Sequence, residues 1–211
     1  MKMKKYLALA LFGLVALTSC GGEEPTDTNS STTTQTVTTP DTISTVSDFS
    51  NAIKNGLKDV FTVTTNAVMK DGETIVYKND TKITITNSET LSGSSVVDRY
   101  SLNQNFKLEK KTKTTYFENL DSNNLFGYNL DDSYFVTKTV DKNSLVGTIK
   151  PESAQAFFNS TSVDVSEPIS VSFVLNNKKL YSITINYKSL DKDVSVSSLK
   201  DVSVSSLYTY K

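Results

Sequence analysis

Hydrophobic and polar residues alternate along this chain with two different periods, and the first of these is helical. Between Ile43 and Val60, hydrophobic residues recur every three or four positions, which places them on one face of an amphipathic helix. The members of this face are Ile43, Val46, Phe49, Ile53, Leu57 and Val60. The preceding Pro40-Asp41-Thr42 supplies a stop signal and a candidate N-cap. We therefore expect a helix that needs another surface to cover its hydrophobic face.

From residue 61 onward the period changes to two, the spacing of half-buried β-strands. We expect strands over 61–69, 74–78, 81–86, 96–102, 106–117, 133–140, 144–149, 169–175 and 181–187. Asp71-Gly72 predicts a tight hairpin turn, and Asn79-Asp80 and Asn176-Asn177 predict two more turns. A proline at position 151 predicts a short helix over 151–158. Strands with one hydrophobic face are typical of an antiparallel sheet that is covered on one side.

The C-terminal region contains a direct repeat. The octapeptide KDVSVSSL occupies residues 192–199 and returns letter for letter at residues 200–207. Because eight is an even number, either copy would present the same residues to the same face of a strand. We interpret the repeat as a tandem duplication at a terminal strand and expect one copy to pair in the sheet. The other interpretation, a functional repeat array, would need three or more units.

The N-terminus has the layout of an export signal, with lysines near the start and a hydrophobic stretch over 6–17. This stretch is too short to cross a bilayer, which needs roughly 20 hydrophobic residues. It ends in Leu17-Thr18-Ser19-Cys20, which resembles the lipobox of bacterial lipoproteins. The resemblance implies cleavage before Cys20 and a covalent diacylglycerol on its sulfur. The alternative is an ordinary signal peptide with a cysteine at this position by chance.

The expected domain organisation follows from these segments. Residues 1–19 form the lipoprotein signal peptide, and residues 20–41 form a lipidated cysteine followed by a polar tether. The tether has almost no hydrophobic side chains, so we expect it to be disordered. Residues 42–211 form a single domain that is long enough to bury a hydrophobic core.

The composition of the 211-residue chain excludes several kinds of catalytic site and cross-link. It has no histidine and one cysteine, which excludes Ser-His-Asp and Cys-His catalysis and an intrachain disulfide. We expect no enzymatic activity, no bound metal and no cofactor other than the covalent diacylglycerol. Asp131-Asp132 is interpreted as a turn rather than an acid–base pair or a cation site. Two Ser-x-x-Lys matches, beginning at Ser189 and Ser197, are expected by chance in a chain so rich in serine and lysine.

Charge gives little indication of a charged partner. The formal net charge is −1, with three lysines in the signal and four acidic residues in the tether, so the charges of the domain balance. This balance argues against nucleic-acid binding. Four lysines between positions 107 and 113 are interpreted as a solvated strand face rather than as contacts for lipid headgroups: Lys107, Lys110, Lys111 and Lys113.

A second resemblance concerns the domain. An opening helix, the strand Gly147-Thr148-Ile149-Lys150 leading into a short helix, and a late hairpin from Pro168 to Tyr187 resemble the half-barrel lipoproteins of the LolA, LppX and LprG kind. The resemblance implies an α+β fold in which an N-terminal helix packs on a curved, mainly antiparallel β-sheet, with one further short helix. Such a fold encloses an apolar cavity for acyl chains. The residues that would then face inward and line the ligand are Ile83, Ile85, Val171, Phe173, Ile183 and Ile185.

The expected function is therefore that of a membrane-anchored extracytoplasmic lipoprotein that binds a lipid or other apolar ligand between helix and sheet, without catalysis. The expected location is the outer face of the cytoplasmic membrane, and the expected form is a monomer. The alternative is a surface-exposed interaction or structural envelope protein with a filled core and no ligand. Strand alternation does not separate the two, because the six candidate lining residues are also what a packed core requires.

Overall fold

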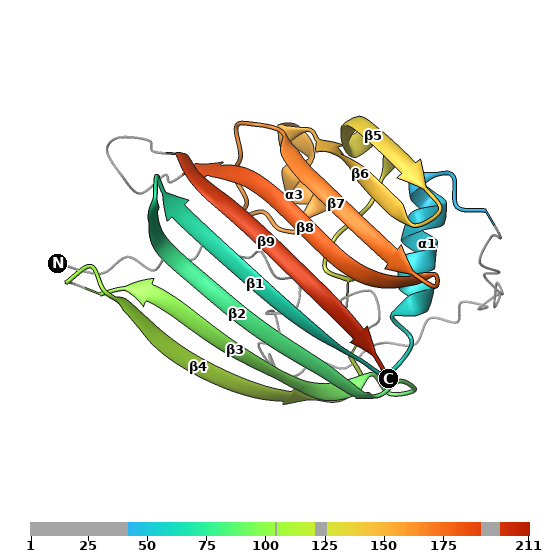
Figure 1. Ribbon diagram of the computed structural model, residues 1–211, viewed down its shortest axis with the longest axis horizontal. Coiled ribbons are helices and arrows are strands. Elements are labelled where there is room, and N and C mark those ends of the chain that lie inside the picture. Colours follow the sequence, from blue (N-terminus) through green and yellow to red (C-terminus); the bar gives the residue numbers. More distant parts are fainter. Residues whose placement is uncertain (1–41, 104, 121–125, 191–198) are drawn as a thin grey trace, which may run out of the picture.

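The computed structural model describes residues 42–103, 105–120, 126–190 and 199–211. These residues form a nine-stranded antiparallel sheet with short helices (Figure 1). The strands are β1 (Phe61–Asp71), β2 (Thr74–Asn87), β3 (Ser92–Leu102), β4 (Leu108–Phe117), β5 (Phe135–Asp141), β6 (Ser144–Ile149), β7 (Ile169–Asn176), β8 (Lys179–Leu190) and β9 (Leu199–Tyr210). The helices are α1 (Val46–Gly56), α3 (Ala154–Phe157) and the 3₁₀ turns η1 (Asp132–Tyr134) and η2 (Pro151–Ser153). The expected combination of helix and antiparallel sheet is confirmed.

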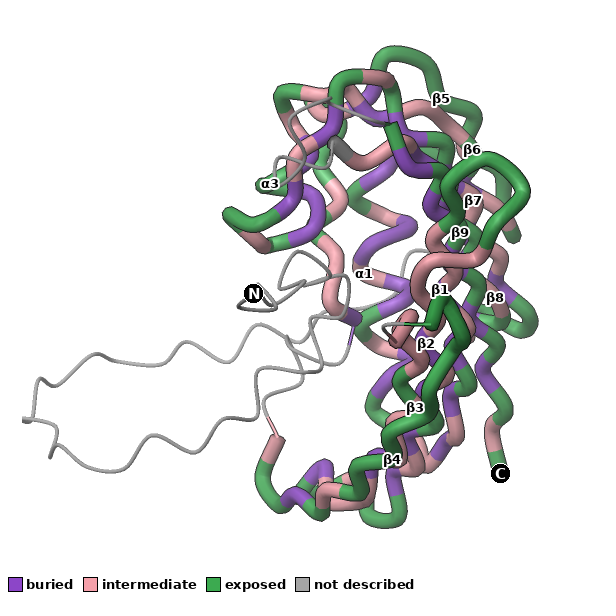
Figure 2. The backbone as a smooth tube through the Cα atoms, turned by 90° about the vertical axis from the view of Figure 1, so that its left-hand side faces the viewer, coloured by how far each residue is buried: buried purple, intermediate pink, exposed green. Residues whose placement is uncertain are grey.

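The strand order is β4-β3-β2-β1-β9-β8-β7-β6-β5, so the last strand pairs with the first. Strands β1 to β4 are consecutive neighbours on one side of this junction, and β5 to β9 are consecutive neighbours on the other. We call these the β1–β4 half and the β5–β9 half. Figure 2 shows α1 and α3 on the same side of the sheet, and we call this side the inner face.

The start of α1 differs from the expectation. The N-cap is Thr45, and not a residue of the predicted Pro40-Asp41-Thr42. The Asp48 amide donates to Thr45 Oγ1 at 3.1 Å, and the Asp48 carboxylate accepts from the Thr45 amide at 3.1 Å. This capping box satisfies two amides that the helix leaves without partners, which explains why the helix starts here. The same hydrogen bonds, with that of the Thr45 side chain first, hold the pKa of Asp48 below its usual value.

Helix α1 lies against the start of β8. Its buried hydrophobic residues include Val46, Phe49 and Ile53, as the periodicity predicted. Gly56 ends the helix at a point where an added Cβ would lie 3.0 Å from the Cα of Lys179, so the missing side chain allows this close approach. The predicted stripe extended to Val60, but the helix stops four residues earlier.

One predicted turn is wrong. Asn79 and Asp80 do not turn the chain but lie inside the uninterrupted strand β2. Asn79 is paired with Ala67 of β1 on one side and with Arg99 of β3 on the other. Hydrogen bonds to two neighbouring strands outweigh the local turn preference of Asn and Asp. The turn at Asp71-Gly72 is confirmed, and Gly72 has the positive φ of +57° that such a turn requires.

The second copy of the repeat occupies β9 and alternates between buried and exposed residues. Val202 and Val204 point to the inner face, whereas Ser203 and Ser205 do not. Of the first copy, all but Leu199 lies outside the described residues, as do the signal peptide, Cys20 and the tether. The expectation that only one copy pairs in the sheet therefore stays a prediction.

Candidate functional site

The six predicted lining residues all lie on the inner face and are buried. Val171 is paired with Ile185, and Phe173 with Ile183, so these four form one group on β7 and β8. The remaining two, Ile83 and Ile85, lie on β2, which is separated from β8 by β9 and β1. The structure thus places all six on one face but divides them between the two halves of the sheet.

The group on β7 and β8 belongs to a packed aromatic cluster. The ring of Phe173 has its centroid 5.8 Å from that of Phe126, 6.2 Å from Tyr128 and 6.5 Å from Phe157. Phe157 in turn stacks on Tyr128 at 5.4 Å. Burial raises the pKa of Tyr128, because the charged phenolate would have no access to water. Under the helices, the inner face of the β5–β9 half is therefore filled with side chains.

The inner face changes character in the β1–β4 half. Two rows of directly paired residues run across the strands, from the hydrophobic centre of the sheet to its edge at β4. The first row is Ile185, Val204, Ala67, Asn79, Arg99 and Lys111. The second row is Ile183, Ser206, Thr65, Thr81, Val97 and Lys113. Both rows begin with isoleucine and end with a cation.

The middle of these rows contains buried polar atoms without hydrogen-bond partners. Asn79 is 1% exposed and Thr81 is 3% exposed. Neither Asn79 Oδ1 nor Thr81 Oγ1 has a partner among the described residues. By contrast, the neighbouring hydroxyls of Thr65 and Ser206 bond to each other at 2.8 Å. Leaving a buried polar group unpaired costs about 1–3 kcal/mol, so these two atoms are candidates for contact with a ligand.

The outer ends of the rows carry three exposed cations, Arg99, Lys111 and Lys113. None of them takes part in an ion pair between described residues. Arg99 does act on a neighbour on the same face. Burial raises the pKa of Tyr77, and the nearby guanidinium of Arg99 partly opposes this shift.

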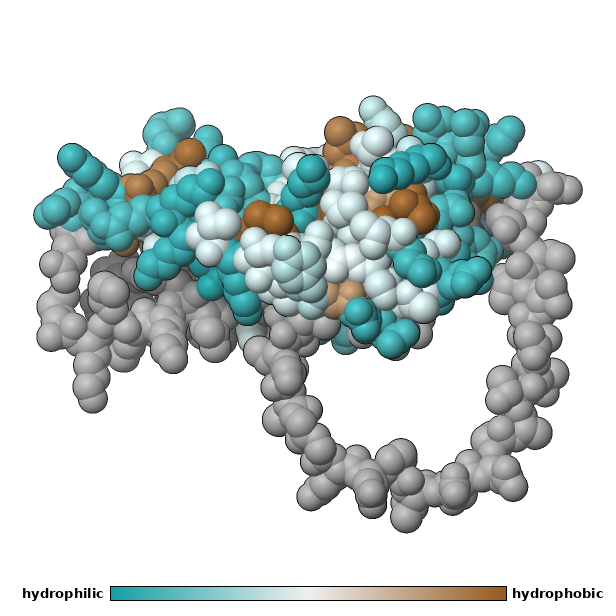
Figure 3. Space-filling view, turned by 90° about the horizontal axis from the view of Figure 1, so that it is seen from below, coloured by the Kyte–Doolittle hydropathy of each residue, from teal (hydrophilic) through white to brown (hydrophobic). Residues whose placement is uncertain are grey.

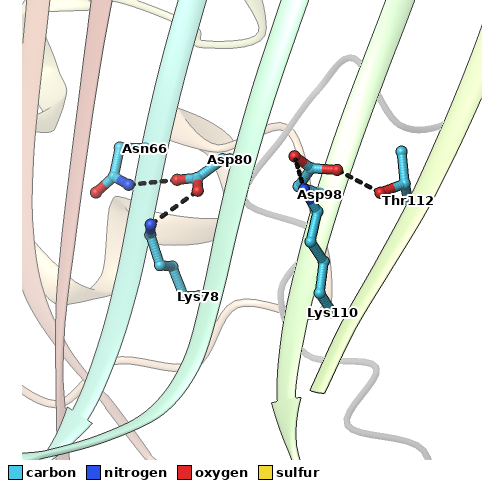
Figure 4. A network of polar contacts seen from close by, with 6 residues as sticks. All are labelled: Asn66, Lys78, Asp80, Asp98, Lys110 and Thr112. Carbon is cyan, nitrogen blue, oxygen red and sulfur yellow. Dashed lines mark hydrogen bonds and ion pairs between the residues drawn. The ribbon is translucent and has the colours of Figure 1, made fainter. Parts of the chain in front are cut away.

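The outer face of the same strands is arranged differently (Figure 4). The carboxylate of Asp80 forms an ion pair with Lys78 Nζ at 2.8 Å. It also accepts a hydrogen bond from the side-chain amide of Asn66. The hydrogen bond that Lys78 donates to the Asp80 carboxylate raises the pKa of Lys78. Each charge in this group therefore has a partner within the fold.

A second outer-face group is centred on Asp98, which is paired with Asp80 across the strands. Its carboxylate bonds to Lys110 Nζ at 2.8 Å and to Thr112 Oγ1 at 2.6 Å. These two hydrogen bonds hold the pKa of Asp98 below its usual value. The repulsion between the two facing carboxylates is offset by the lysine beside each of them. The outer face thus provides an internal comparison for the inner-face cations, which form no ion pair with another described residue.

The surface offers little other chemistry. A groove of about 500 Å³ near the Gly72 turn is lined by Val68, Lys70, Asp201 and Ser203 among others. Seen from below, hydrophobic residues form small separate spots on a mostly hydrophilic described surface (Figure 3). The described residues contain no group of three or more acidic or cysteine side chains placed to hold a metal. Within the same ranges, no helix has the length and hydrophobicity needed to span a bilayer.

No family model matches the chain, and no curated protein matches it.

The polar residues of the inner face were missed in the sequence, because Asn79-Asp80 was interpreted as a turn. The signal that could have found them is the continued alternation of Ile85, Ile83, Thr81, Asn79 and Tyr77 along one face of β2. Asp131, expected in a turn, caps η1 by accepting a 2.8 Å hydrogen bond from the Ser133 amide. This bond confirms the turn that was expected at Asp131.

Proposed function

We propose that this protein is a membrane-anchored extracytoplasmic lipoprotein whose domain binds a lipid or other apolar ligand without catalysis. The lipobox-like Leu17-Thr18-Ser19-Cys20 supports the anchor, with a diacylglycerol on Cys20. Two acyl chains contribute about 0.8 kcal/mol per buried CH₂ group, which is sufficient for stable attachment. The domain would then stand on the outer face of the cytoplasmic membrane, beside a supply of lipid.

The ligand site that we propose lies on the inner face of the β1–β4 half of a half-barrel. Among the described residues, both helices lie over the other half (Figures 1 and 2). Ile83 and Ile85 would contact the apolar part of the ligand. The four other candidates, Val171, Phe173, Ile183 and Ile185, would support the site as core residues.

The observation that carries this proposal is the pair of buried polar atoms, Asn79 Oδ1 and Thr81 Oγ1, without partners among the described residues. A filled core has no use for them, since each destabilises the fold unless something bonds to it. They adjoin the isoleucines of the same strand. A site that combines an apolar wall with a few polar groups is typical of small-molecule binding.

The second candidate function, a surface interaction protein with a filled core, is favoured by two exposed aromatic residues. Phe106 is 84% exposed in the turn between β3 and β4, and Tyr116 is 81% exposed on β4. Aromatic residues in such positions are common at protein interfaces. In this function the ligand would be a protein, bound to the edge of the sheet rather than to its inner face.

Native mass spectrometry of residues 42–211, purified without detergent, tests the proposal. This fragment contains every described element, and its circular dichroism would be checked first. Co-purifying adducts that extraction identifies as lipid are the expected result. A mass without adducts, unchanged after incubation with lipid vesicles, would favour the interaction protein instead.

A further inference from the structure

The cations on the two faces of β2, β3 and β4 differ in whether a carboxylate lies beside them. On the outer face, Lys78 and Lys110 each have a carboxylate at 2.8 Å. On the inner face, Arg99 is paired directly with Lys111 across the β3–β4 ladder. Like charges that face each other in a sheet repel and destabilise it. The inner face therefore carries a repulsion that a bound anion would relieve.

The acidic residue nearest in sequence does not supply this anion. Glu109 lies on β4 two residues before Lys111, and its register partner is Ser101. Its carboxylate accepts a 2.9 Å hydrogen bond from the side-chain amide of Asn103 in the β3–β4 turn. Arg99, Lys111 and Lys113 thus remain outside every ion pair between described residues.

The unpartnered polar atoms adjoin these cations. Asn79 is the direct β2 partner of Arg99, and Thr81 is the partner of Val97, which is paired with Lys113. The hydroxyl of Thr81 can donate to an anionic oxygen, and Asn79 Oδ1 can accept from a hydroxyl group. Arg99, Lys111 and Lys113 are suited to phosphate oxygens, and the guanidinium of Arg99 can bind two of them with parallel hydrogen bonds. The pattern fits a headgroup that has both phosphate and hydroxyl groups.

The hydrophobic end of the site lies along the same strand. On the inner face of β2, Ile85 and Ile83 precede Thr81 and Asn79. With a rise of about 3.3 Å per residue, Ile85 and Asn79 are about 20 Å apart along the strand, comparable to an extended acyl chain. A ligand lying along β2 would place its chain on the isoleucines and its headgroup beside Arg99.

We infer that the inner face of the β1–β4 half binds an acidic amphiphile with a phosphate and hydroxyl headgroup, and that Arg99, Lys111 and Lys113 select the charge. This inference rests on the proposed function and names the chemical class of its ligand. The occupant that we infer is a lipid, because the two rows join the exposed cations to the hydrophobic centre of the sheet, whereas a free phosphate would use only the cations.

A pair of photoreactive lipids tests the inference on the full lipidated chain in membrane vesicles. One probe is a phosphatidylglycerol and the other a diacylglycerol with the same acyl chains. Labelled peptides are mapped by mass spectrometry. We expect phosphatidylglycerol to label residues 61–117 about tenfold more strongly than diacylglycerol, because only phosphatidylglycerol can accept charge-assisted hydrogen bonds from the three cations.

A matched pair of variants identifies the residues responsible. Arg99→Gln/Lys111→Gln/Lys113→Gln removes three inner-face cations, and we expect it to reduce phosphatidylglycerol labelling to the diacylglycerol level. The control removes three outer-face cations of β2 and β4, through Lys78→Gln/Lys82→Gln/Lys110→Gln, and keeps the preference. Both triple variants lose the same charge. The control leaves the Asp80 and Asp98 carboxylates facing each other without their lysines, so the circular dichroism of each variant is compared with that of the original chain before labelling.

Each remaining outcome is decisive. Equal labelling by both probes, unchanged in the inner-face variant, would overturn the charge selection but leave the proposed lipid binding in place. Absence of labelling in residues 61–117 by either probe would overturn both. Loss of labelling in excess inorganic phosphate would show that the site takes the free anion and would overturn the assignment to a lipid.

Discussion

The two halves of the sheet have the same alternating strands, but their inward-facing side chains differ in polarity. In the β5–β9 half, inward side chains meet the helices and a cluster of aromatic rings around Phe173. In the β1–β4 half, inward side chains become polar and then cationic, with Asn79 and Thr81 buried and unpaired among the described residues. A protein that needed only stability would have no reason for this second pattern. We propose that the two polar rows of the β1–β4 half serve binding, whereas hydrophobic inward residues of that half, such as Ile83 and Ile85, belong to the same core cluster as Phe173.

The largest expected loss of stability comes from a substitution in the β5–β9 half. Phe173→Ala removes a fully buried ring from the aromatic cluster and should lower the free energy of unfolding by about 3–5 kcal/mol. Val97→Ala, at a partly exposed inward position of β3, should cost about 1 kcal/mol or less. Urea denaturation followed by circular dichroism measures both. Similar losses for the two variants would show that the halves do not differ as we describe.

Replacing the side-chain amide of Asn79 should raise the free energy of unfolding rather than lower it. Asn79→Leu substitutes a hydrophobic side chain of similar size for a buried polar group, so we expect a gain of about 1–2 kcal/mol in unfolding free energy. We also expect this variant to lose lipid labelling, because the site loses a polar contact. Asn105→Leu, at an exposed position, should change stability by less than about 0.5 kcal/mol. A clear loss of stability in Asn79→Leu would mean that the amide has a structural partner.

A smaller loss of stability is expected from removing the N-cap of α1, the helix that packs on the β5–β9 half. Thr45→Ala removes the hydroxyl that accepts from the Asp48 amide, and it should cost about 1 kcal/mol. Thr45→Ser keeps that hydroxyl and should retain most of the stability. Thermal unfolding of the two variants measures the difference. Equal melting temperatures would show that the cap does not support the packing of α1.

The smallest effect on stability near neutral pH comes from the ionisation of the buried tyrosines. Burial raises the pKa of Tyr128 and Tyr208 in the folded protein above the ordinary value of 10.0. Their contribution to stability is therefore complete below pH 10 and is lost as the pH rises further, since the unfolded chain ionises first. Absorbance of tyrosinate at these positions should appear together with unfolding. Ionisation of both residues in a folded protein would contradict their burial.

Local patterns predicted much of the fold but not its pairing. The 3.6-residue period around Phe49 and Ile53 gave the helix, and the two-residue period of 169–187 gave a hairpin. The pairing of β9 with β1 joins the two ends of the domain, and no local pattern contains that information. Asn79 was misinterpreted because its residue type favours turns, whereas ladders on both sides hold it in a strand. The candidate site depended on that residue, so its polar part was missed, although the alternation of β2 continues through Thr81 and Asn79.

Hydrogen–deuterium exchange of the full chain, in neutral detergent with and without phosphatidylglycerol, tests the division between core and binding surface most directly. The account predicts that the lipid slows exchange in peptides of residues 61–117 and leaves those of residues 169–190 unchanged. Slowed exchange confined to residues 169–190 would place the ligand against the aromatic cluster and would contradict it.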